Sequence, residues 1–257
     1  MPTGAAIFLQ YALTVLGIVS TAVLVAVVLR QWKRTNINPR KFLGVALDRA
    51  GLIDFSVGIL IGTLVMVGTF YVQLSLGYLH VHGFTTAAYK TPTAVLIYLV
   101  AAFFEELISR GMVLTGLIVV VGRRWLAVLL MAAIFGMLHG SNPHATALSI
   151  FSNALGGVVY AVAFLGSKRL WLGTGIHFAW NVVQGPILGL PVSGGVISWG
   201  ELLSVSVAGP TWLTGGSYGP EGGLIAIGFR FAALVLLIGW LRVQRSGSQE
   251  FSPDTSN

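Results

Sequence analysis

Long apolar runs dominate this chain, and short polar stretches separate them. Seven runs approach the roughly 20 residues that a helix needs to cross a bilayer. The pattern predicts an all-α, polytopic transmembrane helix bundle of seven spans, or eight if a broken helix lies in the Gly-rich stretch before the last run. The seven runs are residues 5–29, 55–79, 92–120, 125–140, 145–165, 170–190 and 223–241.

We expect residues 1–245 to form a single integral-membrane domain and the polar segment 246–257 to be a disordered cytoplasmic tail. Composition supports a membrane protein: 55% of the 257 residues are hydrophobic, 9% are charged, and mean hydropathy is +0.85. Soluble domains carry about 25% charged residues. The sequence has no cysteine, which excludes disulfides, thiolate metal sites and a cysteine nucleophile.

The net charge of +7 is explained by topology, so no nucleic-acid function is needed. If the seven spans alternate, twelve Lys and Arg residues lie on one side and only Lys90 on the other. Positive residues stay in cytoplasmic loops, which predicts an outside amino terminus and a cytoplasmic carboxyl terminus. We expect a multi-pass integral membrane protein, located in the cell membrane if the source is prokaryotic, whose basic loops meet lipid headgroups. The twelve are Arg30, Lys33, Arg34, Arg40, Lys41, Arg49, Arg123, Arg124, Lys168, Arg169, Arg242 and Arg245.

Charged side chains inside a span are informative, because each costs roughly 2.5–3.5 kcal/mol at mid-bilayer on insertion scales. The third run contains Glu105, Glu106 and Arg110. Glu106 and Arg110 are four residues apart and are predicted to form an ion pair on one helix face. Glu105 lies about 140° around the helix from Arg110 and is the carboxylate left over. The other acidic residues are expected in or near loops and the tail: Asp48, Asp54, Glu201, Glu221, Glu250 and Asp254.

Two later runs carry polar pairs at helical spacing. Phe135 and His139 are four residues apart, as are His177 and Asn181, so each pair projects from one helix face. If the faces converge, Glu105 can activate a water while the imidazoles orient it or move protons. The amide can donate to a developing oxyanion. These are the components of a hydrolytic site.

Each residue also has a structural interpretation. A single intramembrane histidine is commonly a packing residue, and Glu106 with Arg110 can be a purely structural ion pair. Asn181 can bond a neighbouring helix, and Phe135 is expected in the core or against lipid. Arg230, near the start of the last span, is expected to reach the interface or to pair.

Together the three motifs resemble those of a known family. EELISR at 105–110 fits EExxxR, FGMLH at 135–139 fits FxxxH, and HFAWN at 177–181 fits HxxxN, in that order. The pattern is similar to the CPBP family, also called the Abi or CAAX protease family, of intramembrane glutamic endopeptidases. The resemblance covers residues 90–190, and the family-like core is expected to continue to the last span at 223–241.

The resemblance implies an intramembrane endopeptidase, with CAAX-type prenyl-protein processing as its associated activity. It implies that Glu105 activates the hydrolytic water with His139. His177 and Asn181 would stabilise the oxyanion, and the predicted ion pair would shape the site. GSYGPEGG at 216–223 is also similar to bacterial members. The implied substrate is a peptide or a membrane-anchored protein, and the implied mechanism needs no cofactor.

Alternatives remain at this point. Glu105, His139 and His177 could bind a catalytic zinc ion with an open position for water, which would make the protein a metallopeptidase. No HExxH, intramembrane Asp pair or GxSG setting points to another hydrolase class. A catalytically silent scaffold or regulator would use the same residues for stability, and a transporter would use them as a proton relay. The sequence leaves the oligomeric state open.

Overall fold

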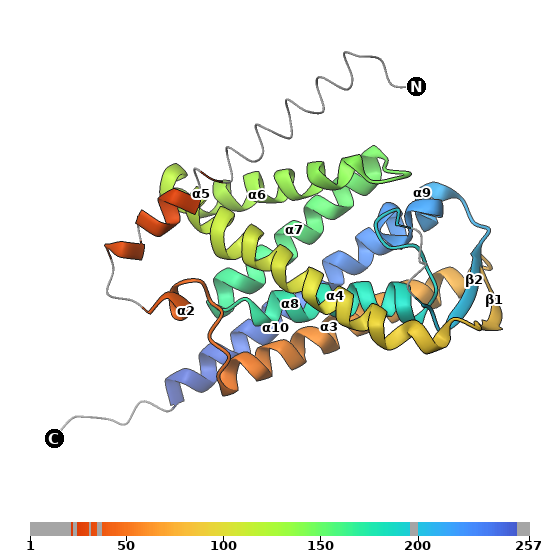
Figure 1. The fold of residues 1–257 in the computed structure, drawn as a ribbon, viewed down its shortest axis with the longest axis horizontal. Coiled ribbons are helices and arrows are strands. Elements are labelled where there is room, and N and C mark those ends of the chain that lie inside the picture. Colours follow the sequence, from red (N-terminus) through yellow and green to blue (C-terminus); the bar gives the residue numbers. More distant parts are fainter. Residues whose placement is uncertain (1–21, 23–24, 31, 35–37, 196–199, 251–257) are drawn as a thin grey trace, which may run out of the picture.

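The computed structural model describes residues 22, 25–30, 32–34, 38–195 and 200–250. The bundle is helical, as predicted (Figure 1). Its α-helices are α2 (Pro39–Phe42), α3 (Arg49–Ser75), α4 (Thr91–Glu106), α5 (Thr115–Val121), α6 (Arg124–Leu138), α7 (Ala147–Ser167), α8 (Trp171–Val182), α9 (Thr211–Thr214) and α10 (Leu224–Glu250). Two π-helical segments, Leu107–Leu114 and Val183–Ile187, continue α4 and α8.

Five helices of the described residues are long and apolar enough to cross a membrane. Their bounds are Arg49–Ser75, Ala88–Val121, Arg124–Ser141, Ala147–Ser167 and Leu224–Arg245. They correspond to five of the seven predicted spans. The first predicted span, 5–29, lies mostly outside the described residues. The sixth, 170–190, is the 12-residue helix α8 with its π-helical continuation, and it is not among these five.

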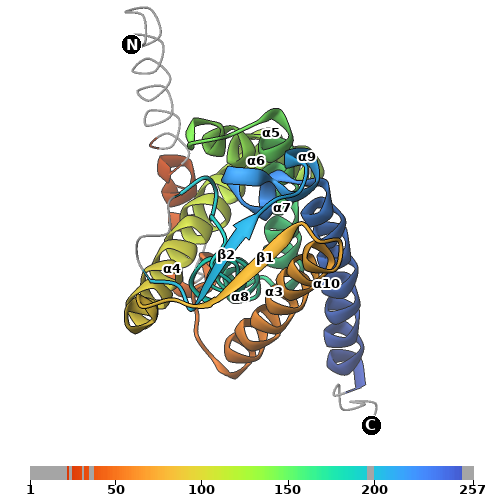
Figure 2. The same ribbon diagram turned by 90° about the vertical axis from the view of Figure 1, so that its right-hand side faces the viewer.

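One element departs from the all-α prediction. Strand β1 (Leu79–Phe84) pairs antiparallel with β2 (Leu203–Val207), with Leu79 opposite Val207. Figure 2 looks onto this end of the bundle, where the two strands lie side by side. Strand β2 lies within residues 190–222, the Gly-rich stretch before the last apolar run. Their LSVSV segment alternates apolar and polar residues as a strand does, but its partner is distant in sequence, so no local hairpin signal existed.

Small residues allow the central helix α8 to approach α3 closely. A Cβ added at Gly58 or Gly62 of α3 would lie 2.4 or 2.5 Å from a backbone oxygen of α8. A Cβ at Gly175 of α8 would lie 2.4 Å from a backbone oxygen of α3. Where lipid supplies no hydrophobic drive for helix association, such close backbone packing is what holds helices together. This packing fixes the position of α8, which carries His177.

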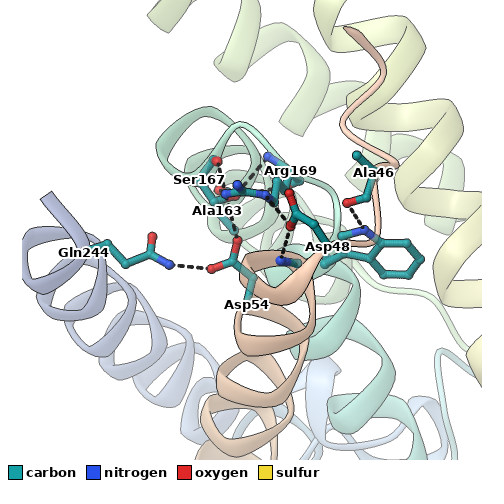
Figure 3. Close-up of polar contacts among 9 residues, drawn as sticks. Ala46, Asp48, Asp54, Ala163, Ser167, Arg169 and Gln244 are labelled. Atoms are coloured by element: carbon teal, nitrogen blue, oxygen red, sulfur yellow. Dashed lines mark hydrogen bonds and ion pairs between the residues drawn. The ribbon is translucent and has the colours of Figure 1, made fainter. Parts of the chain in front are cut away.

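A polar cluster ties three segments together at the end of the bundle that holds the predicted cytoplasmic loops (Figure 3). We call it the basic-end cluster: Asp48, Asp54, Arg169 and Gln244. Arg169 Nε lies 3.5 Å from Asp48 Oδ1, and its Nη1 lies 3.7 Å from Asp54 Oδ2. Gln244 of α10 donates to the other Asp54 oxygen at 2.5 Å. Asp54, expected near a loop, is fully buried in α3, because α3 begins at Arg49 and not at 55.

Helix α10 reaches Glu250. It therefore extends five residues beyond position 245, where the disordered tail was expected to begin. Residues 251–257 of the predicted tail lie outside the described residues. The described terminus of α10 lies at the same end as the basic-end cluster, because Gln244 contacts α3 there (Figure 3).

Candidate active site

A cavity of about 440 Å³ lies within the bundle. All four residues predicted to carry chemistry line it: Glu105, His139, His177 and Asn181. They come from α4, the end of α6, and α8. The geometry therefore brings together the three motifs that sequence spacing placed on separate helices. At the end with the two strands the lining continues into the connections between helices, through Asn142 and Ser193.

The adjacent glutamates Glu105 and Glu106 occupy different environments. Glu106 is 1% exposed, whereas the side chain of Glu105 is 46% exposed. Glu106 Oε1 accepts from Arg110 Nη1 at 3.0 Å, which is the ion pair predicted from the i, i+4 spacing. No ion pair to Lys or Arg involves Glu105 in the described part of the chain; His177 Nε2 lies 3.9 Å from its Oε2. Glu106 is thus held by partners, and Glu105 faces the cavity.

Glu106 also orients His177. Its Oε1 lies 2.9 Å from His177 Nδ1. A carboxylate can only accept here, so Nδ1 carries the proton and Nε2 is directed to the Glu105 side. The Tyr160 ring stacks on the imidazole, with centroids 4.7 Å apart and planes inclined by 13°. These contacts fix both the tautomer and the plane of the His177 ring.

Arg110 is fully buried, and aromatic rings surround its guanidinium. Its Nη2 donates to the Gly157 carbonyl at 3.2 Å. Its Cζ lies 4.5 Å from the Phe135 ring centroid and 5.0 Å from that of Tyr160, within the range of cation–π attraction. The π-helical segment Leu107–Leu114 carries this arginine, and such segments occur frequently at functional sites.

The FxxxH motif has a direct structural basis. His139 Nδ1 lies 2.8 Å from the Phe135 carbonyl oxygen, four residues earlier. A carbonyl only accepts, so Nδ1 donates and Nε2 remains as an acceptor. The Phe135 ring contacts both imidazoles, with centroids 4.6 Å from His139 and 6.2 Å from His177. Phe135, expected to serve only as core or lipid-facing bulk, therefore positions three polar groups.

Asn181 lines the same cavity one helical turn after His177. Among the described residues, no hydrogen bond to its side chain is present. Its amide is therefore available to a group inside the cavity. The predicted i, i+4 relation to His177 holds, because both positions lie in the α-helical part of α8.

Two charged residues of the cavity were not predicted as site residues. Glu221 is 2% exposed, and its oxygens accept from the Ser193 backbone N–H at 2.7 Å and hydroxyl at 3.1 Å. Arg230 of α10 is 3% exposed and also lines the cavity. Glu221 lies within GSYGPEGG, and Arg230 is a charge inside an apolar run, so both had a sequence signal. Glu221 lies in the connection before α10, as expected, but is buried there; of the two expectations for Arg230, pairing inside the bundle is the one observed.

A buried polar contact joins the connection between β2 and α10 to α7. Asn153 Nδ2 donates to the Tyr218 hydroxyl at 2.7 Å. Burial, together with the nearby charge of Glu221, raises the pKa of Tyr218 to about 12, so this phenol stays neutral throughout the physiological range. The contact fixes the segment that carries Glu221 against the cavity wall.

The zinc alternative requires three ligands close enough to share one ion. Among the described residues, no group of three His, Asp or Glu side chains has that arrangement. Glu105, His139 and His177 line one cavity but do not form a ligand set in this geometry.

Comparison with known proteins identifies the segment that carries the motifs. Residues 87–183 match the family model described as type II CAAX prenyl endopeptidase Rce1-like, which confirms the resemblance predicted from the three motifs. No curated protein and no solved structure matches the chain. The matched segment includes Glu105, His139, His177 and Asn181 but ends before Glu221 and Arg230. The matched model describes a family of membrane endopeptidases, and together with the five apolar helices it indicates an integral membrane protein.

Proposed function

Because residues 87–183 match the Rce1-like endopeptidase family, we propose that this protein is an intramembrane endopeptidase of the glutamic type. It hydrolyses a peptide bond in a peptide or membrane-anchored substrate with a water activated by Glu105. The observation that carries the proposal is the contrast between two adjacent carboxylates. Glu106 is held by Arg110 and His177, whereas Glu105 opens onto the cavity.

In the proposed reaction a water binds between Glu105 and the free Nε2 of His139. Glu105 takes a proton as the water attacks the scissile carbonyl, and His139 accepts a hydrogen bond that orients the water. The proton then passes to the leaving amine. General acid–base groups of this kind contribute typically 10²- to 10⁴-fold in rate. A general base must be reachable by water, and the half-exposed side chain of Glu105 meets this requirement.

His177 and Asn181 stabilise the oxyanion of the tetrahedral intermediate. His177 Nδ1–H donates a hydrogen bond to Glu106, so the ring can donate to the oxyanion through Nε2 only when that nitrogen also carries a proton. The Asn181 amide is the second donor. Donors fixed before the reaction act without reorganisation, and one such donor contributes about 10²- to 10³-fold in rate.

The test is hydrolysis of a quenched, prenylated CAAX-type peptide library by the purified protein in liposomes. Glu105→Gln keeps the size of the side chain and removes the base. Glu201→Gln, an acid outside the cavity lining, is the matched control. We expect Glu105→Gln to lower kcat about 10³-fold and Glu201→Gln to leave it unchanged. Full activity of Glu105→Gln would contradict the proposal.

A chelator arm addresses the metal alternative in the same assay. Retained activity with chelator supports hydrolysis by side chains and water alone. Loss of activity with chelator, restored by zinc, would contradict the metal-free mechanism. That result would require Glu105, His139 and His177 to move together on binding zinc.

A further inference from the structure

A separate groove, away from the active-site cavity, is lined by residues of α6, α7 and α10. Its volume is about 470 Å³. Helix α7 packs against both α6 and α10. Three arginines line the groove, Arg124 of α6 and Arg242 and Arg245 of α10. We call it the arginine groove. It lies at the end of the bundle that holds the basic-end cluster, because the same stretch of α10 carries Gln244 of that cluster.

The arginine groove lies at the ends of three helices that are long and apolar enough to cross a membrane. Arg124 is the first residue of one such span, Arg245 is the last residue of another, and the third ends at Ser167. The ends of spanning helices lie at the depth of the lipid headgroups. Trp125, which is 67% exposed and also lines the groove, is of a type favoured at this depth. The arginines are therefore placed at the level of lipid phosphates.

Further into the spans the groove is apolar. Val162 and Leu165 of α7 and Ile238 and Leu241 of α10 line this part. A Cβ added at Gly166 would lie 2.3 Å from Leu241 Cδ1, so α7 and α10 approach closely beside the groove. A charged rim next to an apolar interior matches the two parts of a phospholipid, a polar headgroup and an acyl chain.

Helix α10 uses two faces at this end. Ile238, Arg242 and Arg245 are spaced i, i+4 and i+7 and therefore project from one face, which lines the groove. Gln244 lies about 200° around the helix from Arg242 and contacts Asp54 of α3. The contact that ties α10 to the basic-end cluster is thus separate from the face that lines the arginine groove.

The positive charge of the groove is not balanced within its lining. None of the described residues that line it is acidic, and the ion pairs found among the described residues do not include Arg124 or Arg245. Arg124 is the first residue of α6, where the helix dipole opposes a cation. Arg242 and Arg245 are three residues apart on α10, so their like charges repel. An anion bound between the arginines offsets both effects.

Topology alone does not account for this arrangement. The tendency of Lys and Arg to stay on one side of a membrane explains why arginines gather at this end. It does not require arginines from two helices to line one groove that has apolar walls. The combination favours a ligand that carries both a negative charge and a hydrocarbon chain.

We propose that the arginine groove binds an anionic phospholipid, with the phosphate at the arginines and an acyl chain along the apolar walls. Basic pockets between transmembrane helices bind anionic headgroups, and the guanidinium fork matches a phosphate. The bound lipid bridges α6 and α10 across α7 and therefore stabilises the bundle against unfolding. This inference does not depend on the proposed peptidase function.

The test measures lipid binding by the delipidated, purified protein in detergent, using native mass spectrometry and thermal unfolding. Anionic phosphatidylglycerol is compared with neutral phosphatidylcholine that has the same acyl chains. We expect the wild type to bind phosphatidylglycerol about 10-fold more tightly or better, and its unfolding temperature to rise only with that lipid. Inorganic phosphate should have no such effect. Equal binding of the two lipids, or equal stabilisation by inorganic phosphate, would overturn the proposal.

A double variant, Arg124→Gln with Arg245→Gln, removes two of the three groove arginines. We expect it to bind phosphatidylglycerol about 10-fold more weakly or worse and to lose the stabilisation. The matched control, Arg40→Gln with Arg49→Gln, removes the same charge from exposed arginines outside the groove lining. Arg49, like Arg124, is the first residue of its helix. The control should bind as the wild type does, and an equal loss in both double variants would overturn the proposal.

The single variants give a second readout. Arg124→Gln or Arg245→Gln alone should weaken phosphatidylglycerol binding about 5-fold. Both side chains are exposed, so the unfolding temperature without added lipid should stay near that of the wild type. Variants that unfold at a lower temperature without lipid but bind phosphatidylglycerol as the wild type does would give these arginines a purely structural role and overturn the proposal. Peptide cleavage is not part of any of these measurements, so failure of the proposed function would leave their outcome unchanged.

Discussion

The basic-end cluster and the cavity region of this bundle use buried charge differently. In the basic-end cluster, Asp54 is fully buried, but Arg169 and Gln244 engage its two oxygens. Behind the cavity lining, Glu106 is matched in the same way by Arg110 and His177, while Glu105 and Arg230, which line the cavity, have no ion pair to Lys, Arg, Asp or Glu among the described residues. Buried charges that have a partner within the protein stabilise the fold. Charged side chains that line a cavity without such a partner are available to a ligand.

The largest effect on folding is expected from breaking the buried ion pair between Glu106 and Arg110. Arg110→Ala strands Glu106 in a site that is 1% exposed, and removing one partner of a buried pair costs about 3–5 kcal/mol. We predict a marked fall in folded yield and thermal unfolding temperature. Thermal unfolding in detergent is the measurement.

Arg169→Ala is the comparison for that prediction. Its side chain is 31% exposed, so water can replace part of what is lost, and Gln244 still engages Asp54. We expect a cost of about 1 kcal/mol. Equal falls in unfolding temperature for Arg110→Ala and Arg169→Ala would mean that the Glu106–Arg110 ion pair contributes no more to stability than the Asp54–Arg169 ion pair.

A smaller effect is expected from crowding the unmatched arginine. Gly156→Ala places a methyl group 2.0 Å from Arg230 Nη1, so the far end of this flexible side chain must shift; we expect a cost at the lower end of the range typical of overpacking, about 1 kcal/mol. Gly228→Ala is the control, because a Cβ there meets nothing within 4 Å. The thermal unfolding temperature should fall only for Gly156→Ala. Equal unfolding temperatures for Gly156→Ala and Gly228→Ala would mean that the close contact between Gly156 and Arg230 does not affect stability.

The smallest expected effect is a pH dependence at the start of α3. A backbone hydrogen bond from Gly51, at 2.8 Å, is the largest cause that lowers the pKa of Asp48 below its usual 3.8. A lowered folded-state pKa stabilises the fold above pH 3.8, and that contribution is lost as pH falls through the folded-state value. Asp48→Asn keeps the cap and removes the titration.

Unfolding temperatures of wild type and Asp48→Asn, followed from pH 6 to pH 3, test this. The wild type should lose stability relative to Asp48→Asn at the acid end. If the difference in unfolding temperature between wild type and Asp48→Asn stayed constant from pH 6 to pH 3, the negative charge of Asp48 would not contribute to stability.

The charges inside the third apolar run were predictable because their rarity and helical spacing are local properties. Glu106 and Arg110 form the expected pair, and Glu105 is separate from it. The pairing of β1 with β2 was not predictable, since it joins segments more than a hundred residues apart. Tertiary packing, which sequence spacing does not encode, also decides the burial of Asp54 and the placement of Arg230.

The local geometry of the motifs also could not be predicted from the periodicity of apolar residues. The π-helical segment Leu107–Leu114 begins directly after Glu106, and nothing in the residue pattern marks the change from α to π. The contact of Phe135 with both imidazoles likewise depends on how α6 and α8 meet. Spacing placed the residues on faces, whereas packing set their distances.

The most direct test of the central claim compares Glu105→Gln with Glu106→Gln, measuring peptide cleavage and thermal unfolding on the same preparations. Glu105→Gln should lose cleavage about 10³-fold while its unfolding temperature stays near that of the wild type, since it removes a charge that no arginine balances. Glu106→Gln should lower the unfolding temperature, because it weakens the contacts to Arg110 and His177. The reverse pattern, with cleavage retained in Glu105→Gln and stability retained in Glu106→Gln, would contradict the division between a chemical and a structural glutamate.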